Sequence, residues 1–134
     1  MSKNNLQIYL HIVFSTKNRN PLISVSIEKK LYPFIWKVIE HNDCTPLMIN
    51  GMPDHVHVLL KMDSKVSLSN LMKFMKGKSS RFLNENHTYL ESFEWQCGYG
   101  AFSGSPENVD KVIGYIKNQK QHHREDSTIE DFEH

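Results

Sequence analysis

Hydrophobic and polar residues alternate along residues 8–15, where Leu10, Ile12 and Phe14 share one side of the alternation. A period of two, combined with β-branched and aromatic residues, predicts a strand with one buried face. Residues 45–50 and 55–62 have the same character around the short connection GMPD, which predicts a hairpin. Residues 95–103, WQCGYGAFS, predict a fourth strand, in which two glycines indicate close approach of another group to the backbone.

Apolar residues recur at helical spacing in three further segments. The first begins at Ile27 and contains Pro33, which costs about 3 kcal/mol inside a helix, so it predicts either a kinked helix or one that begins near Tyr32. The third follows Ser105 and Pro106, which have the form of an N-cap and a first-turn proline. The three apolar stripes are Leu31, Phe34, Ile35, Val38 and Ile39; Leu68, Leu71, Met72, Met75 and Phe82; and Val109, Val112, Ile113 and Ile116.

The predicted elements follow the order strand, helix, strand, strand, helix, strand, helix. This order is typical of an α+β fold, the ferredoxin-like split βαβ sandwich, with helices on one face of an antiparallel sheet and a further C-terminal helix. The 134 residues, 39% of them hydrophobic, suffice for one core. We therefore expect a single domain over residues 1–134, with an acidic tail at residues 125–134.

Composition argues against a membrane or secreted protein. No apolar run approaches the roughly 20 residues of a membrane-spanning helix, and the N-terminus lacks a signal sequence, so we expect a cytoplasmic protein without a membrane partner. Cys44 and Cys97 match no disulfide or zinc pattern and are predicted to be buried free thiols. The net charge is +1, but residues 1–124 hold 16 basic and 10 acidic residues, a balance of +6 that is compatible with a polyanionic partner.

Two histidines interrupt the strand predicted at residues 55–62. His55 and His57 are two residues apart, so they share one face of the strand while Val56 and Val58 enter the core on the other face. Imidazoles at this spacing can hold one divalent ion. An isolated pair of this kind is more often a half-buried surface feature, and two ligands do not complete a metal site.

The third predicted helix carries a possible complement to the histidine pair. Tyr115, Gln119 and His122 are spaced i, i+4 and i+7 and so line one helix face. If this face meets the histidines, Gln119 can supply an oxygen ligand and Tyr115 a nucleophile. Taken alone, the tyrosine is more often an amphipathic side chain at the rim of a core, and the glutamine a solvated one.

Several segments together resemble one family. GMPDHVHVLL resembles the histidine–hydrophobe–histidine (HUH) motif of the single-tyrosine transposases of IS200-like insertion sequences, which move as single-stranded DNA. WQCGYGAFSGSP and YIKNQKQHH resemble two downstream signatures of this family, and HIVFSTKNRNPLI resembles its usual opening. The resemblance implies a DNA transposase that cleaves one strand at the hairpin ends of an insertion sequence and rejoins it through a 5′-phosphotyrosine intermediate.

The same resemblance implies the site residues. Tyr115 would attack the scissile phosphodiester, and His55, His57 and Gln119 would hold a divalent metal. A phenol has a pKa of about 10 and needs help to attack at neutral pH, and a cation offsets the charge that develops on the phosphate. Mg²⁺ or Mn²⁺ is expected, although imidazole ligands also tolerate zinc, cobalt or nickel.

Basic residues in two segments are candidates for contacts with DNA phosphates. Their alternative role is that of a solvated surface. Tyr99 and Phe102 are candidates for stacking on unpaired bases, although packing in the core is the commoner role of such residues. The basic candidates are Lys17 and Arg19 after the first strand, and Lys73, Lys76, Lys78 and Arg81 in KFMKGKSSRF, where Ser79 and Ser80 add hydroxyl groups.

Family members of this size resemble homodimers in which the tyrosine helix of one subunit completes the histidine site of the other. The predicted sheet face with His55 and His57 has no helix of its own to cover it, so we expect composite sites, with residues 98–106 as the connecting arm. Gly114 precedes the proposed nucleophile and costs about 1 kcal/mol relative to alanine in a helix. It either loosens the helix or admits DNA closely.

Three alternatives stay open from the sequence. A non-catalytic module that binds single-stranded nucleic acid on its open sheet would explain the basic residues. A domesticated relative that nicks hairpin repeats would use the same catalytic residues. Metal-dependent hydrolysis with water as the nucleophile would make Tyr115 dispensable.

Overall fold

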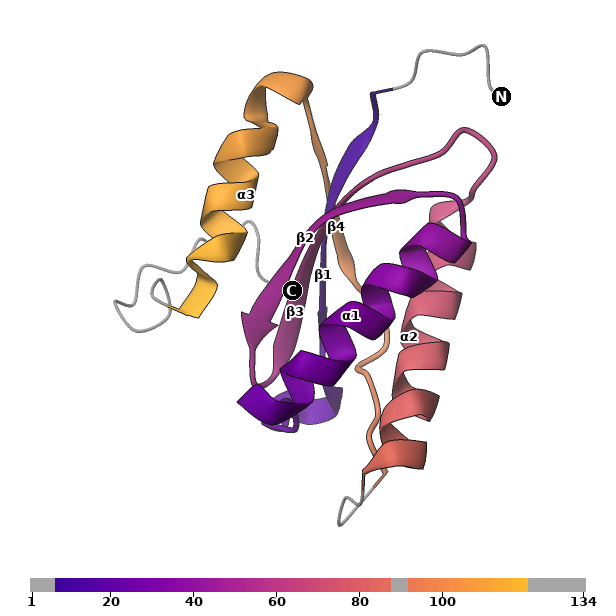
Figure 1. The fold of residues 1–134 in the computed structure, drawn as a ribbon, viewed down its shortest axis with the longest axis vertical. Coiled ribbons are helices and arrows are strands. Elements are labelled where there is room, and N and C mark those ends of the chain that lie inside the picture. Colours follow the sequence, from indigo (N-terminus) through magenta and orange to yellow (C-terminus); the bar gives the residue numbers. More distant parts are fainter. Residues whose placement is uncertain (1–6, 88–91, 121–134) are drawn as a thin grey trace.

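A four-stranded antiparallel sheet in the order β2-β3-β1-β4 is the centre of the fold (Figure 1). The computed structural model describes residues 7–87 and 92–120. One helix joins β1 to β2 and another joins β3 to β4, so two βαβ units interleave. This arrangement confirms the ferredoxin-like split βαβ fold. The elements of the two units are β1 (Tyr9–Ser15), α1 (Val25–His41), β2 (Thr45–Met52), β3 (His55–Lys61), α2 (Leu68–Asn86) and β4 (Gly100–Gly104).

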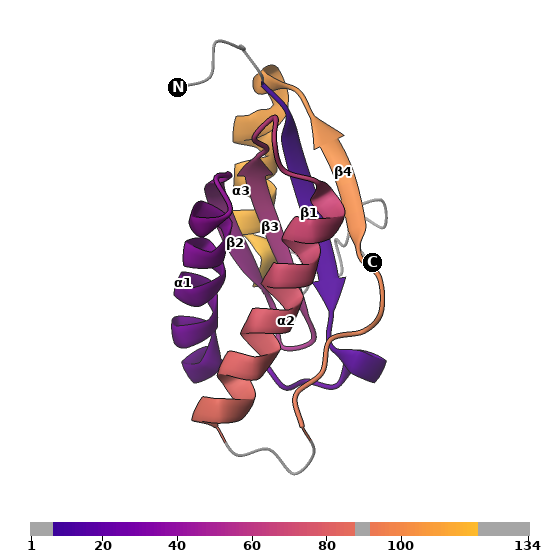
Figure 2. The ribbon, with the colours of Figure 1, turned by 90° about the vertical axis from the view of Figure 1, so that its right-hand side faces the viewer.

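The helices α1 and α2 cover one face of the sheet and form the main hydrophobic core with it (Figure 2). Ile12 and Phe14 of β1 point to this face and are fully buried. In the register of the sheet they lie opposite Val58 and Val56 of β3, which are also fully buried. The alternation of the sequence therefore predicts correctly which side chains enter this core.

The helix α1 runs through Pro33 without ending there. It begins after Ser24, whose side chain accepts a hydrogen bond from the backbone N–H of Ile27. The alternative start near Tyr32 is therefore wrong. Pro33 lies on the exposed side of the helix, and burial of Leu31, Ile35 and the other apolar residues of the stripe offsets the cost of the proline.

The strand predicted at residues 95–103 is divided in two. Trp95 forms an isolated bridge with Thr16, and the backbone N–H of Gln96 donates to the carbonyl of Ser15 at 2.8 Å. The chain then turns at Gly98, whose φ of 84° is a conformation that favours glycine, and re-enters the sheet as β4. The prediction of one continuous strand is therefore wrong.

A third helix, α3 (Val109–Lys117), lies on the opposite side of the sheet from α1 and α2 (Figure 1). The signal at Ser105 and Pro106 begins a short 3₁₀ turn, and the α-helix follows it. Tyr115 and Ile116 of α3 pack with Leu59 of β3. The expectation that the histidine face has no helix of its own is wrong, because the chain reverses after β4 and returns across β2 and β3.

Several sequence-based expectations fall at the margins of the described chain. Cys44 is buried and Cys97 is exposed, so the prediction of buried thiols holds for Cys44 only; burial raises the pKa of Cys44. Within residues 7–87 and 92–120, no helix has the length and apolar character needed to cross a bilayer. His122 and the acidic tail at residues 125–134 lie outside the described residues.

Candidate active site

The two histidines of β3 lie side by side under α3. Both side chains are buried, with 1% exposure for His55 and none for His57, and their ring centroids are 5.1 Å apart. They occupy alternate positions of the strand, and the next residue on the same face, Leu59, belongs to the cluster that α3 covers. The structure thus encloses the histidine pair between the sheet and α3.

His55 is held by the residue that precedes it. Its Nδ1 lies 2.7 Å from Oδ1 of Asp54, and the other carboxylate oxygen of Asp54 accepts a hydrogen bond from Nε of Arg19 at 3.0 Å. Burial by itself raises the pKa of Asp54, but the hydrogen bonds from Arg19 and His55 outweigh it and leave the pKa below its ordinary value. Asp54 therefore stays ionised at neutral pH as an acceptor for the His55 ring.

His57 is held by a third histidine that sequence reasoning missed. Its Nδ1 lies 2.8 Å from Nε2 of His11 on β1, and the two rings stack with centroids 5.0 Å apart. His11 is buried, with 2% exposure. The available signal was the position of His11 on the polar side of the first predicted strand, but a single histidine there does not indicate which strand lies beside it.

Tyr115 reaches this group of histidines from α3 of the same chain. Its ring centroid lies 5.8 Å from that of His57 and 6.2 Å from that of His11, and the side chain is 8% exposed. Gln119 follows one helical turn later, just beyond the end of α3, and its side chain is fully buried. The structure therefore brings Tyr115, His55 and His57 together within one chain.

Polar contacts attach the end of α3 to β2. The side-chain amide of Asn50 donates to the carbonyls of Ile116 and Lys117, at 3.0 and 3.2 Å. The ammonium of Lys120 donates to Oδ1 of Asn50 at 3.0 Å and lies 2.8 Å from a carboxylate oxygen of Glu28 on α1. These contacts satisfy carbonyls at the helix C-terminus and fix α3 beside the histidines.

Gly51 brings the hairpin strands into close contact next to His55. A Cβ atom at this position would lie only 2.2 Å from the carbonyl oxygen of His55 and 3.0 Å from the Cα of Val56. No other residue type fits there without a shift of the backbone. The glycine of the GMPDHVH segment therefore sets the position of the histidine strand.

The basic candidates fall on two different sides of the molecule. Lys17 and Arg19 follow β1, at the end of the sheet where Ser15 lies opposite His55. Arg19 contacts Asp54, and Lys17 pairs with Glu94 at 2.8 Å. Both side chains are exposed, which leaves their charges beside the mouth of the histidine site.

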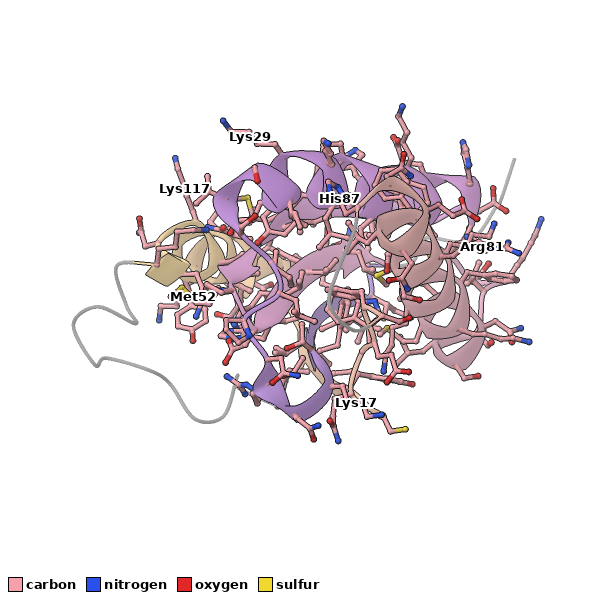
Figure 3. The ribbon with its side chains drawn as sticks, turned by 90° about the horizontal axis from the view of Figure 1, so that it is seen from below. Lys17, Lys29, Met52, Arg81, His87 and Lys117 are labelled. Carbon is pink, nitrogen blue, oxygen red and sulfur yellow. The ribbon has the colours of Figure 1, made fainter. Side chains whose placement is uncertain are left out.

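The candidates on α2 lie on the other side of the sheet from the histidine site. Figure 3 shows Arg81 projecting from α2 on the side away from α3 and Met52. Lys76 donates to the carbonyls of Gln96 and Gly98, and its burial lowers its pKa, so it holds the connection to β4. The exposed side chains are Lys73, Lys78 and Arg81; Lys78 lies over the ring of Phe74, and Arg81 pairs with Glu85.

The chain matches the sequence model of the family described as "Transposase IS200 like" over residues 4–119. It belongs to the IS200-like transposase family. The transposase of insertion sequence element IS200 from Salmonella typhimurium is 31% identical over 114 residues, which cover 81% of this IS200-like chain and 74% of the relative. The ISDra2 transposase of Deinococcus radiodurans is 24% identical over 118 residues, 84% of each chain.

Two solved structures have the same fold as this IS200-like transposase. A protein of Deinococcus radiodurans R1, described as a transposase, has a TM-score of 0.71 at 20% identity and covers 89% of this chain and 95% of its own. A REP-associated tyrosine transposase bound to a REP hairpin has a TM-score of 0.69 at 15% identity and covers 92% of this chain and 74% of its own. At these identities the likeness shows a shared fold.

Proposed function

We propose that this DNA transposase cleaves one DNA strand with Tyr115 and rejoins it through a 5′-phosphotyrosine intermediate, at the hairpin ends of an insertion sequence. The observation that carries the proposal is the position of the Tyr115 ring, 5.8 Å from that of His57 and buried against the strand that bears the HUH histidines. A non-catalytic module would leave this group of side chains unexplained.

A divalent metal fits the residues present. Among the described residues, no three His, Cys, Asp or Glu side chains form a cluster that could hold a metal, so a third ligand must be of another type. His55, His57 and the buried amide of Gln119 would provide two nitrogens and one oxygen without adding negative charge. Bound there, Mg²⁺ or Mn²⁺ would supply a Lewis acid for the phosphate oxygens.

The neighbours of the histidines would select the nitrogen that faces the metal. Asp54 accepts a proton from Nδ1 of His55, which leaves Nε2 as the ligand atom. If Nδ1 of His57 donates to Nε2 of His11, Nε2 of His57 takes the same role. Asp54 and His11 are therefore proposed as positioning residues.

The proposed reaction conserves the phosphodiester bond. The Tyr115 hydroxyl loses its proton as its oxygen attacks phosphorus, the bond from phosphorus to the 3′ oxygen breaks, and that oxygen leaves as a 3′-hydroxyl. The 5′ phosphate stays attached to Tyr115 until another 3′-hydroxyl attacks it and releases the phenol. Burial under α3 limits access of water to the linkage, which favours rejoining over hydrolysis.

The proposed substrate is single-stranded or hairpin DNA. Lys17 and Arg19 would bind phosphates beside the site, because their exposed charges lie at the His55 end of the sheet. Lys73, Lys76, Lys78 and Arg81 were predicted to bind DNA as well, and on α2 they would contact only DNA that extends around the molecule. For a substrate of this kind we also propose a cytoplasmic location.

Each chain would carry a complete site of its own. Tyr115 lies with the histidines of the same chain, and Asn50 and Lys120 fix that arrangement. The homodimer remains part of the proposal, but exchange of α3 between subunits would require these contacts to break and form again with the partner.

A nickase of hairpin repeats is the second candidate. A structure of the same fold is a REP-associated tyrosine transposase bound to a REP hairpin, which favours a hairpin substrate for a chain of this architecture. The chemistry and the residues would be those described above. Substrate preference between repeats and insertion-sequence ends separates the two candidates.

The decisive experiment is a test for a covalent adduct. The protein is incubated with a labelled single-stranded hairpin and Mg²⁺, and denaturing electrophoresis is expected to show a protein–DNA adduct that is absent in Tyr115→Phe. Tyr32→Phe on α1 is the matched control, because its hydroxyl contacts Glu28 on the other face of the sheet. Cleavage that persists in Tyr115→Phe would indicate water as the nucleophile, and binding without cleavage in the wild type would indicate a binding module.

A further inference from the structure

A cavity of about 270 Å³ lies between the first turns of α3 and the sheet, outside the group of catalytic candidates. We propose that it binds one nucleobase of the substrate strand, from a nucleotide next to the cleaved phosphate. This inference rests on the proposed function, because it assigns a subsite to the DNA that Tyr115 would cleave. The cavity is lined chiefly by His11, Leu59, Phe102, Asn108, Val109 and Val112.

The cavity is adjacent to the proposed nucleophile. His11 lines it, and the ring of His11 lies 6.2 Å from that of Tyr115 and 6.0 Å from that of Phe102. Val112 lines it from α3 and precedes Tyr115 by three residues, about 4.5 Å along the helix axis. A nucleotide with its phosphate at Tyr115 therefore has its base, or that of its neighbour, within reach of the cavity.

The walls suit a flat, unpaired ring. Phe102 and Tyr9 provide aromatic surfaces, and Leu59 and Val112 provide aliphatic ones. Aromatic surfaces of this kind bind bases of single strands by stacking, and a cavity of this volume lies below the usual range for drug-sized ligands, which excludes a base pair. A base is therefore expected to enter only when it is turned out of a helix or lies in a single strand.

Polar residues lie at the rim of the cavity, where the sugar and phosphate would remain. Asn108 and Lys111 line it from the start of α3, and both are exposed. The amide can bond the edge of a base, and the ammonium can pair with a phosphate. A purely apolar ligand would leave the lysine and the amide without a role, so the charge favours a nucleotide.

The test is an abasic scan of affinity. A single strand that spans the cleavage point, mapped with the wild type, is made with one base removed at a time, and its binding to the Tyr115→Phe protein is measured by fluorescence anisotropy. Removal of one base within two nucleotides of the cleaved phosphate should weaken binding roughly tenfold. Because the protein cannot cleave, the result does not depend on catalysis.

Two variants connect that base with the cavity. Phe102→Ala removes the stacking surface, and Val109→Phe fills the space without changing the neighbour of His11. Both should weaken binding of the intact strand and abolish the further loss at the abasic position. Phe74→Ala, an exposed phenylalanine on α2, is the matched control and should keep that loss. Thermal melting checks that each variant is folded.

A flat abasic profile would overturn the proposal, as would an abasic loss that stays tenfold in both cavity variants. Failure of the proposed function is a different result: the wild type would form no Tyr115 adduct on any strand. In that case the scan is run along the whole strand, and the absence of a cavity-dependent position still refutes the subsite.

Discussion

His55 and His57 are supported by contacts of unequal range along the chain. Asp54 holds His55 from the adjacent position in the hairpin, whereas His11 holds His57 across two strands, 46 residues away in sequence. The second contact depends on the register of β1 with β3, which places His11 opposite Leu59, the next residue on the His57 face. The geometry of His57 therefore depends on correct assembly of the sheet.

We predict that His11→Ala weakens metal binding by 10- to 100-fold, the usual loss when a partner of a ligand histidine is removed. His11→Gln should recover part of the affinity, because its amide oxygen can accept the proton of His57. Isothermal titration with Mn²⁺ measures the affinity directly. His41→Ala, at the exposed end of α1, is the control, and equal affinities in His11→Ala and wild type would refute the role of His11.

The residues of the site differ in how far the sequence identifies them. His55 and His57 follow from a period of two within a strand, and Tyr115 and Gln119 from helical spacing and the family resemblance. His11 lacks such a signal, because the sequence alone does not reveal the register between β1 and β3. Cys97 was expected to be buried, but it lies where the chain leaves the sheet and is exposed.

The β2–β3 hairpin depends on one glycine. Gly51→Ala would place a methyl carbon against the carbonyl oxygen of His55, so we predict a loss of about 1–3 kcal/mol in the free energy of unfolding and a displaced His55. Chemical denaturation measures the first effect, and Mn²⁺ affinity the second.

Gly77→Ala provides the matched control for Gly51→Ala. A Cβ at Gly77, in the middle of α2, meets no atom within 4 Å, so this alanine should stabilise the protein by up to about 1 kcal/mol. If the two substitutions had the same effect on stability, close packing at Gly51 would not be the cause.

Most helices and strands were predictable from local periodicity, and the errors have identifiable causes. The strand at residues 95–103 is interrupted because Gly98 adopts a positive φ, which no hydrophobic pattern records. The helix α1 extends to Ser24 because tertiary burial outweighs the cost of Pro33. The position of α3 on the second face depends on the direction of the chain after β4, which local periodicity does not contain.

The arrangement of α3 within one chain leads to a test on mixed subunits. We predict that a mixture of Tyr115→Phe and His57→Ala chains, unfolded and refolded together, forms no covalent adduct with DNA, because every chain then lacks one part of its own site. Each variant alone and the wild type taken through the same treatment are the controls. An adduct in the mixture would show instead that helices are exchanged between subunits.

The distribution of charge over the two faces leads to a test with DNA of different lengths. We predict that replacing Lys73, Lys78 and Arg81 by alanine lowers the salt dependence of hairpin binding by roughly two to three contacts' worth of slope and leaves a short single strand unaffected. The matched control replaces Lys29, Lys30 and Lys37, three exposed lysines of α1. An unchanged slope with the long hairpin would remove α2 from the DNA-binding surface.

The two faces of the sheet have different tasks. The main core, with α1 and α2, lies on one face, and the histidines with Tyr115 lie on the other. Substitutions that end cleavage therefore leave most of the buried apolar surface intact. Gene copies that decay in activity would still yield folded protein able to occupy DNA ends, and such proteins would compete with active copies for the same ends.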